Sequence, residues 1–590
     1  MICPGANRFL RVSSPFQLPK SGHWEWNDLG AQAKRVWRDL NPRPLPSKSL
    51  TPFRGRKYDE SSMENDRILR GRGLNAVFLA GLRAVQCVLA SCHRDDDFCQ
   101  KGRPHTRRGQ VTTSAGLVAL LLMMGAAAVN AQQVDMRIAR IEAGLLPPIL
   151  WKGEPRVGQP LKDRMVQIQV PGVSVAVVDN FAPAWARGWG VVRAGDAGVV
   201  TSDTLFQAGS ASKTVAALLA LRLVSRGRIG LDDPVNTRLT SWKLPDSSAG
   251  GEQAVTIRHL LSHSAGLTPV TYPALDPGNE IPTALQLLQA NGKYSSFAIA
   301  RVEPPGKRFA YSNAAYVILQ QLLADVSGKA FNDLARAELF EPLGMTNSSF
   351  APVPPAALLD RAAWGHGAGQ QPAAFKGGIV PAAVGGLWTT PSDLVRLLAA
   401  FLRSFRGDAD GLLPQELAHE ALTTQVGSQS LVAPVEGQGS NLRMFQLGAM
   451  PGFVAYLVGY PELGRGAAVM VNAGGRSGEL VREIARAIAT EYDWPDYIRE
   501  YERAMRPPDT LAAFGGQYEF DSPPGFKIEI SVKDGRLFWG DREMVAVVGG
   551  TFVVPTAGGE VEFIRDAAGT IVGLDYGPPG ARRARARRIN

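Results

Sequence analysis

Cysteine is absent from most of the sequence. Of 590 residues only four are cysteines, and these lie within the first 100: Cys3, Cys87, Cys92 and Cys99. The remainder of the chain therefore has no disulfide framework, no cysteine-ligated zinc site and no thiol nucleophile. A cysteine-free domain folds in either redox environment, so this absence alone indicates no compartment.

The composition also lacks any extreme. Hydrophobic residues make up 45% of the sequence, charged residues 20% and aromatic residues 8%. These fractions exclude a wholly disordered chain, a collagen-like chain and a membrane protein with many spans. The length fits two to four domains of roughly 150 residues each.

The body of the chain has no excess of positive charge, although the formal net charge is +10. Residues 1–110 hold 20 Lys and Arg against 10 Asp and Glu, and residues 581–588 hold five arginines. The part between these ends is slightly acidic. We therefore expect no nucleic-acid partner for the folded body.

Only one stretch is strongly apolar, and it is too short to span a bilayer comfortably. The 15 residues Ala115–Val129 are apolar or small, three arginines precede them, and a small-x-small pattern ends at Ala131. This order predicts a signal peptide over 111–131 with cleavage after Ala131, and hence a periplasmic or secreted protein. An uncleaved segment would instead tether the protein to a membrane. We interpret residues 1–110 as an unstructured basic extension or as sequence upstream of the true start.

Hydrophobic periodicity predicts strands at both ends of residues 135–505 and helices between them. Strands are predicted at 166–179, 182–192, 446–460 and 466–473, and helices at 213–226, 256–262, 314–327, 392–405 and 478–491. Thr390 is expected to cap the helix at 392, because Pro391 and Asp393 suit its first turn. The pattern favours an α+β fold with one antiparallel sheet, helices on its faces and a helical insertion. It disfavours a parallel dinucleotide-binding sheet.

A second domain is predicted at 510–580. Arg506–Asp509 breaks the chain, and seven short strand patterns follow, separated by Gly, Asp and Pro turns. Such spacing predicts a small all-β sandwich or barrel. The Arg-rich residues 581–590 are expected to form a solvated, disordered tail.

One motif carries nucleophile chemistry. Ser210 and Lys213 form a Ser-x-x-Lys motif, and residues three apart share one face of a helix. A serine hydroxyl needs a neighbouring base, and a lysine serves as that base when burial lowers its pKa. Gly209 precedes the motif, so Ser210 is expected at a helix N-terminus, where the helix dipole favours a developing anion.

A second motif is Tyr311-Ser312-Asn313. A tyrosine beside a lysine can shuttle a proton, and an asparagine amide can hold a substrate carbonyl. The same residues also suit a capped helix start, with Ser312 or Asn313 as the cap. The two readings are compatible.

Together these motifs resemble those of the serine β-lactamase-like hydrolases, a family that includes class C β-lactamases, D-Ala-D-Ala carboxypeptidases, D-aminopeptidases and carboxylesterases. The resemblance covers about residues 150–495 in the family's order, through the segments FQAGSASKTVAALLALRLV (206–224), VTIRHLLSHSAGL (255–267), PPGKRFAYSN (304–313), LFEPLGMTNSSF (339–350) and GGLWTTPSDLVRLLAAFL (385–402). It implies the family's antiparallel sheet with flanking helices and an all-helical region. The trailing β-domain resembles the lipocalin-like appendage of some members.

The resemblance also implies roles for individual residues. Ser210 would be the acylated nucleophile and Lys213 its general base or the group that tunes that base. Tyr311 would pass a proton to the leaving group, and Asn313 would orient the substrate. No metal and no organic cofactor is implied.

The family's third motif, Lys or His followed by any residue and Gly, matches Gln446-Leu447-Gly448. The backbone N–H groups of Ser210 and Ala449 would then form the oxyanion hole. Gln446 is a departure, because it offers a neutral amide where the family has a cation for a substrate carboxylate. This favours neutral esters or amides over penicillins and D-Ala-D-Ala ends, unless a cation such as Arg443 substitutes.

The resulting hypothesis is an exported serine hydrolase that cleaves an ester or amide bond in a small molecule or peptide through an acyl-enzyme on Ser210. One alternative is a β-lactamase or D-Ala-D-Ala carboxypeptidase that acts on the cell wall. The other is an inactive binding or sensor protein on the same scaffold. His259 and His263 have a metal-ligand spacing but no third ligand nearby, so no metal site is expected.

Overall fold

The computed structural model describes residues 129, 131–246, 251–275, 280–372, 380–521, 525–556, 558–577 and 584–589. The chain divides into two units, Met1–Thr113 and Ser114–Asn590, and all described residues belong to the second. The predicted extension 1–110 and most of the predicted signal peptide 111–131 lie outside the described residues. Among the described helices, none combines the length and the apolar character needed to cross a bilayer.

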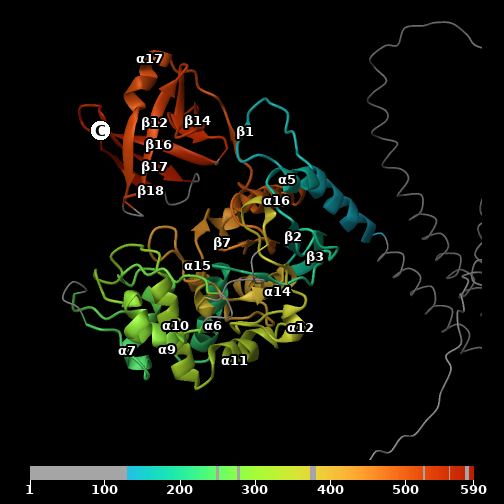
Figure 1. Cartoon of the computed structure of the whole chain (residues 1–590), viewed down its shortest axis with the longest axis vertical. Coiled ribbons are helices and arrows are strands. Elements are labelled where there is room, and N and C mark those ends of the chain that lie inside the picture. Colours follow the sequence, from blue (N-terminus) through green and yellow to red (C-terminus); the bar gives the residue numbers. More distant parts are fainter. Residues whose placement is uncertain are drawn as a thin grey trace, which may run out of the picture. The chain divides into compact units, whose positions relative to one another are not determined.

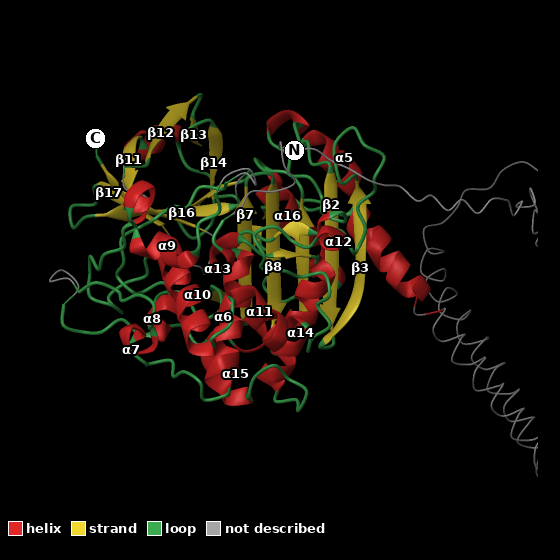
Figure 2. Cartoon of the chain, turned by 60° about the horizontal axis from the view of Figure 1, so that its bottom comes forward, coloured by secondary structure: helices red, strands yellow, loops and turns green. Residues whose placement is uncertain are grey.

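The centre of the hydrolase region is a six-stranded antiparallel sheet, as the sequence predicted (Figure 2). Its strand order is β3 (Ala182–Gly190), β2 (Gly172–Asp179), β9 (Arg465–Val471), β8 (Phe453–Tyr460), β7 (Arg443–Met450) and β6 (Val435–Glu436). Strands from the start of the domain therefore lie beside strands from its end. The predicted strand at 166–179 begins too early, because Val166 and Gln167 belong to helix α5 (Leu161–Gln167).

Both faces of the sheet are buried at its central strands, as β2 illustrates. Val173, Val175 and Val177 pack into the cluster that contains α16 (Ser477–Glu491). Ala176 and Val178, which point the other way, pack into the cluster that contains α14 (Pro391–Arg406). Successive side chains of a strand alternate between faces, so an unbroken apolar run buries both. Helices consequently cover both sides of the sheet.

The helical region follows β3 along the chain (Figure 1). Its elements are α6 (Ala211–Ser225), α7 (Val235–Arg238), α8 (Ile257–Leu261), α9 (Ala284–Gln289), α10 (Asn313–Ser327), α11 (Phe331–Ala335), α12 (Ala356–Leu359), α13 (Ala382–Gly385) and α15 (Gln415–Leu422), with a short two-stranded pairing of β4 (Phe206–Gln207) and β5 (Trp388–Thr389). All five predicted helices are present, as α6, α8, α10, α14 and α16. Thr390 caps α14 by accepting a hydrogen bond from the N–H of Asp393, as predicted.

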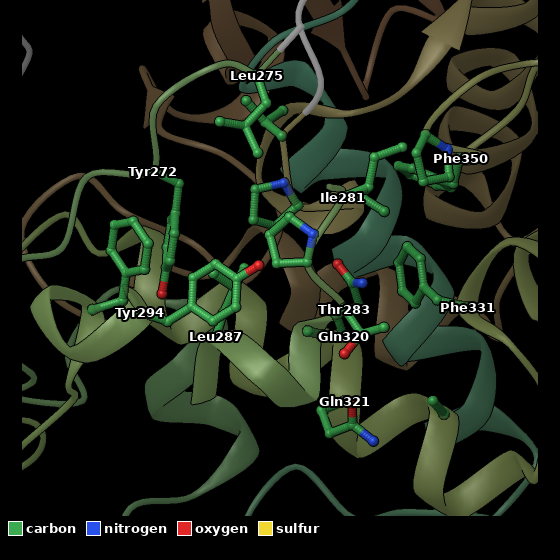
Figure 3. A pocket seen from close by; sticks show the side chains of 18 of the residues that line it. Tyr272, Leu275, Ile281, Thr283, Leu287, Tyr294, Gln320, Gln321, Phe331 and Phe350 are labelled. Atoms are coloured by element: carbon green, nitrogen blue, oxygen red, sulfur yellow. The ribbon is translucent and has the colours of Figure 1, made fainter. Parts of the chain in front are cut away.

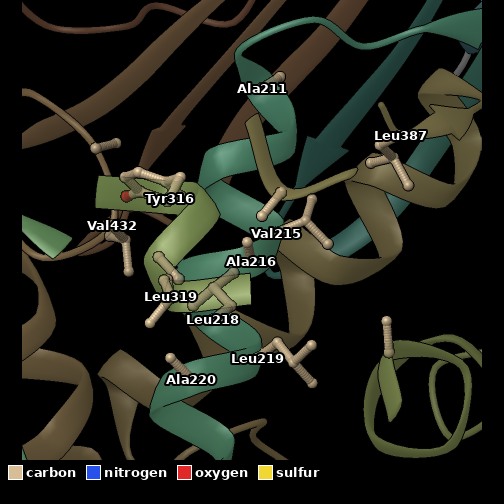
Figure 4. Packing of buried hydrophobic residues seen from close by; sticks show 14 of the residues in the cluster. Ala211, Val215, Ala216, Leu218, Leu219, Ala220, Tyr316, Leu319, Leu387 and Val432 are labelled. Atoms are coloured by element: carbon tan, nitrogen blue, oxygen red, sulfur yellow. The ribbon is translucent and has the colours of Figure 1, made fainter. Parts of the chain in front are cut away.

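Helix α6 is the buried axis of this region. Its residues from Ala211 to Leu221 are all buried, including those on opposite sides of the helix. Val215, Ala216 and Leu219 belong to one buried cluster with Tyr316 of α10 and Leu387, which lie on opposite sides of α6 (Figure 4). A helix that is apolar all round belongs in the interior, so the N-terminus of α6 is fixed by packing on every side.

The predicted strand region 446–460 contains two strands, β7 and β8, joined by a tight turn at Pro451-Gly452. Gly452 has a φ of +80°, a conformation that glycine adopts without strain. The turn places β7 between β8 and β6, where β7 also contacts α6.

The C-terminal domain is a closed eight-stranded antiparallel barrel. Its strands are β11 (Gly516–Phe520), β12 (Lys527–Lys533), β13 (Arg536–Trp539), β14 (Arg542–Ala546), β15 (Phe552–Val554), β16 (Gly559–Arg565), β17 (Ile571–Gly577) and β18 (Ala584–Arg588). The first seven correspond to the seven predicted strands.

The expectation of a disordered tail from 581 to 590 is wrong for residues 584–588. These residues form β18, which pairs with both β11 and β17 and closes the barrel. Ala586 points into the core, while Arg585 pairs with Asp575 and Arg587 pairs with Glu519. Because successive side chains of a strand alternate between faces, Ala586 points inward while Arg585 and Arg587 point outward.

Candidate active site

Ser210 stands at the N-cap of α6, and the chain approaches it through a constrained turn. Gly209 has a φ of +52°, and a Cβ atom at that position would stand 2.6 Å from the nitrogen of Ala449. A Cβ on Gly448 would stand 1.9 Å from the carbonyl oxygen of Ala208. Glycine is therefore required on both sides of this contact. The sequence analysis assigned Ser210, Gly448 and Ala449 to one site, and in the structure the chain segments that contain them are in contact.

Lys213 lies one turn further along α6 and is only 2% exposed. Its Nζ donates hydrogen bonds to Ser210 Oγ, at 3.2 Å, and to the carbonyl oxygen of Val384, at 2.7 Å. Burial lowers the pKa of Lys213 to about 7, because removal from water disfavours the charged amine. No ion pair with a described carboxylate offsets that cost.

Tyr311 faces the same serine from the loop before α10. Its hydroxyl and Ser210 Oγ share a hydrogen bond of 2.8 Å, and the Lys213 nitrogen lies 5.0 Å from the centre of its ring. Desolvation raises the pKa of Tyr311, and the hydrogen bond with Ser210 acts in the opposite direction. Ser212 lies in the same turn of α6 but bonds the backbone N–H of Leu387. Ser210 is thus the serine that meets both Lys213 and Tyr311.

His263 is a component of the site that the sequence analysis did not assign. It is buried, and its ring centre lies 4.5 Å from that of Tyr311. Its Nδ1 accepts a hydrogen bond from the N–H of Ser312 at 3.1 Å, which leaves the other ring nitrogen to carry the proton. Burial, with the charge of Lys213 as a further cause, lowers the pKa of His263 to about 3. The neutral imidazole therefore supports Tyr311 without adding charge.

His259, one of the two histidines with metal-ligand spacing, takes part in a helix cap. His259 accepts a hydrogen bond from the N–H of Thr256 and completes the capping box of α8. Among the described residues, no group of three or more His, Cys, Asp or Glu side chains is placed to hold a metal ion.

Two amide side chains were predicted to contact the substrate. The Nδ2 of Asn313, at the start of α10, lies 3.5 Å from the carbonyl oxygen of Val270. The Nε2 of Gln446, on β7, donates a hydrogen bond of 2.8 Å to the carbonyl of Leu447. Arg443, the possible substitute cation, is buried and paired with Glu436, and it also contacts Tyr460. Arg443 therefore does not substitute for the missing cation near Gln446, because its guanidinium is already paired with Glu436.

The N–H of Ala449 points toward α6. Strand β6 pairs only with Arg443 and Met444, at the start of β7. Along the rest of that edge of β7, no described strand is paired with it. The N–H of Phe445 donates to Pro434 on this side, at 3.0 Å. Backbone N–H groups alternate in direction along a strand, so the N–H of Ala449 points to the same edge. It faces the turn before α6, where a Cβ on Gly209 would stand 2.6 Å from the Ala449 nitrogen.

Residues 158–491 match the family model described as Beta-lactamase. Beta-lactamase of Escherichia coli strain K12 is 29% identical over 237 residues, which cover 40% of this chain and 58% of that protein. Penicillin-binding protein 4 of Amycolatopsis lactamdurans is 28% identical over 347 residues, with 54% and 86% covered. Esterase EstB of Burkholderia gladioli is 29% identical over 255 residues, with 38% and 62% covered.

The match therefore spans less than two thirds of the length of the Escherichia coli and Burkholderia proteins. Among solved structures, the octameric penicillin-binding protein homologue from Pyrococcus abyssi has 21% identity and a TM-score of 0.49, and the similarity covers 72% of this chain and 98% of that one. The family match takes in more than half of the chain and includes Ser210, Lys213, Tyr311 and Gln446. This protein belongs to the beta-lactamase family of serine hydrolases.

Proposed function

We propose that the protein hydrolyses an ester or amide bond through an acyl-enzyme formed on Ser210. The observation that carries this proposal is the buried amine of Lys213, whose pKa is lowered to about 7 and which lies 3.2 Å from Ser210 Oγ. A base that is half deprotonated near neutral pH matches the requirement of general-base catalysis. A lysine in ordinary surroundings does not meet this requirement, because its amine stays protonated at neutral pH.

In the acylation step, Ser210 Oγ forms a bond to the substrate carbonyl carbon as neutral Lys213 takes the serine proton. The backbone N–H groups of Ser210 and Ala449 hold the oxygen that becomes negative. The proton that Lys213 took then passes through Tyr311, 2.8 Å from Ser210 Oγ, to the leaving oxygen or nitrogen as its bond to carbon breaks, so Lys213 is neutral again. Water then attacks the acyl carbon and gives a proton to Lys213, the bond from carbon to Ser210 Oγ breaks, and that proton returns to Ser210 Oγ as the acid is released.

The site supports neutral substrates better than carboxylate-bearing ones. Gln446 supplies only an amide, and Arg443 is engaged by Glu436. A charge-assisted hydrogen bond is about twice as strong as a neutral one, so a substrate carboxylate would lose about 1–2 kcal/mol here.

A second candidate is hydrolysis of β-lactams or D-Ala-D-Ala peptides, and the names of the relatives favour it. Turnover of a chromogenic cephalosporin or of a D-Ala-D-Ala peptide at rates similar to those for neutral esters would support this candidate over the first.

The experiment that tests the proposal is labelling with a fluorophosphonate, followed by intact mass and peptide mapping. We expect one adduct on Ser210 in the native protein and none in Ser210→Ala, with Ser212→Ala as a matched control that still labels. Absence of an adduct on folded protein would contradict the proposal and favour an inactive binding protein on this scaffold.

A further inference from the structure

A cavity of about 670 Å³ lies in the helical region beside α13 (Figure 3). Tyr272 and Tyr294 border it on one side, and Phe331 and Phe350 border it on the other. Its volume falls within the range of about 300–1,000 Å³ that is typical of small-molecule sites. None of the three proposed catalytic side chains lines it.

The cavity adjoins the candidate active site through α13. Ala382, the first residue of α13, lines the cavity, and two residues later Val384 accepts the hydrogen bond from Lys213. A Cβ on Gly385 would stand 3.3 Å from a methyl carbon of Val380, which also lines the cavity. The same point lies 3.7 Å from the carbonyl carbon of Gly209, so the cavity wall comes within about 7 Å of the residue before Ser210.

The cavity wall is also connected to the candidate active site at Asn313. Val270, whose carbonyl oxygen lies 3.5 Å from the amide nitrogen of Asn313, is two residues before Tyr272. Gln320, which also lines the cavity, accepts a hydrogen bond from the N–H of Ala383 and thereby fixes α13. Elements that shape the catalytic site therefore continue directly into the cavity wall.

The chemistry of the wall indicates what it binds. Its lining is mostly apolar, and Lys293 is the one charged side chain among the described lining residues. Lys293 is already paired with Glu280, so the wall offers no free charge to an ionic ligand. The hydroxyl of Tyr272 is buried and has no hydrogen-bond partner among the described residues. A buried hydroxyl without a partner is unfavourable, and an acceptor atom on a ligand would relieve that cost.

We propose that this cavity receives a long apolar chain of the substrate that Ser210 cleaves, and that the Tyr272 hydroxyl donates a hydrogen bond to an oxygen on that chain. The substrate class is then a neutral ester or amide with a chain of about six carbons or more that carries an oxygen atom within reach of Tyr272. This inference rests on the proposed function for its catalytic part. Its binding part stands on the cavity alone.

The first experiment compares kcat/KM for p-nitrophenyl acetate, hexanoate and decanoate. Each buried methylene favours binding by about 0.8 kcal/mol, so kcat/KM is expected to rise about three- to fourfold per methylene until the cavity is full. Ala324→Trp fills the cavity from α10 and is expected to abolish this rise. Lys329→Trp, on an exposed residue of the same segment outside the cavity, is expected to retain it.

The second experiment measures binding without catalysis, in Ser210→Ala. 2-Decanone and decane are titrated while tyrosine and tryptophan fluorescence is followed. Both are expected to bind, and Tyr272→Phe is expected to weaken 2-decanone about three- to tenfold and leave decane unchanged. This conservative variant also serves if Ala324→Trp fails to fold, which circular dichroism would reveal.

The outcomes separate the two proposals. Hydrolysis of acetate with no dependence on chain length would overturn the cavity inference and leave the proposed function intact. Binding of 2-decanone that depends on Tyr272, without labelling of Ser210, would retain the cavity as a ligand site and remove the proposed catalysis. Equal binding to the Ala324→Trp variant and the native protein would contradict the assignment of the chain to this cavity.

Discussion

The amine of Lys213 and the hydroxyl of Ser210 are 3.2 Å apart, one turn of α6 from each other, and the amine has the Val384 carbonyl as its other hydrogen-bond partner. A carbonyl accepts a hydrogen bond from either protonation state of an amine but neutralises no charge. Burial therefore determines the charge state of Lys213 and lowers its pKa to about 7.

The rate of acylation is expected to follow the deprotonation of Lys213. In the proposed mechanism the neutral amine is the active form, so kcat/KM is expected to rise with pH and to reach half of its maximum near pH 7. Stopped-flow or steady-state rates on a neutral ester from pH 5 to 9 give the profile. A profile that is flat across this range would contradict the assignment of Lys213 as the base.

The stability of the protein is expected to depend on pH through the same amine. Its pKa is lowered in the folded state, so between about pH 7 and pH 10 the unfolded chain holds a proton that the folded chain has lost. The free energy of unfolding therefore rises with pH in this window, by up to about 4 kcal/mol. Urea unfolding of Lys213→Met at several pH values should lack this contribution. If the unfolding free energies of the two proteins changed with pH in parallel, the contribution of Lys213 would be excluded.

Tyr311→Phe is expected to lower kcat by about 100-fold, because it removes the group that, in the proposed mechanism, passes a proton to the leaving atom. Tyr311 is 46% exposed, so its loss should change the melting temperature little. Calorimetry and ester kinetics on the same preparation separate the two effects. A variant that loses activity only through unfolding would argue against the proton-transfer role.

Gly448→Ala is expected to destabilise the protein by about 1–3 kcal/mol and to abolish labelling of Ser210. The new Cβ would meet the Ala208 carbonyl oxygen at 1.9 Å and the Ala211 nitrogen at 2.8 Å, both at the start of α6. Gly474→Ala is the matched control, since its Cβ would have no atom nearer than 3.7 Å. Thermal unfolding and fluorophosphonate labelling of both variants provide the comparison.

Gln446→Lys is expected to shift preference toward carboxylate-bearing substrates. A cation on β7 would replace a neutral hydrogen bond with a charge-assisted one, which corresponds to about a five- to thirtyfold gain in kcat/KM. Two esters that differ only by a carboxylate give the ratio directly. Equal changes for both esters would show that the residue does not contact that group.

Local patterns were sufficient to predict most of the fold. The β-branched residues of β2, the Thr390 cap and the Ser-x-x-Lys spacing each depend on neighbours within a few positions. His263 was not assigned, because its contact with Tyr311 joins residues 48 apart through a backbone hydrogen bond to Ser312. The hydrogen bond from Lys213 to the carbonyl of Val384 could not be predicted, since every residue has a backbone carbonyl and the residue type does not mark this one.

The error at the C-terminal end has a different cause. Five arginines in eight residues were interpreted by their charge, while the alternation around Ala584 and Ala586 was the relevant signal. Asp575 and Glu519, on the flanking strands, accept the charges of Arg585 and Arg587. A charge-rich segment is compatible with a strand when its neighbours supply the opposite charge.

Closure of the barrel by β18 sets an order of events during synthesis. The strand at 584–588 is the last of the eight in chain order, so β11 and β17 keep unpaired backbone edges until this strand has been synthesised and has docked. An open strand edge is a template for pairing with another chain. A chain that lacks residues 584–588 would thus combine an unchanged hydrolase region with an open barrel whose two exposed strand edges favour aggregation.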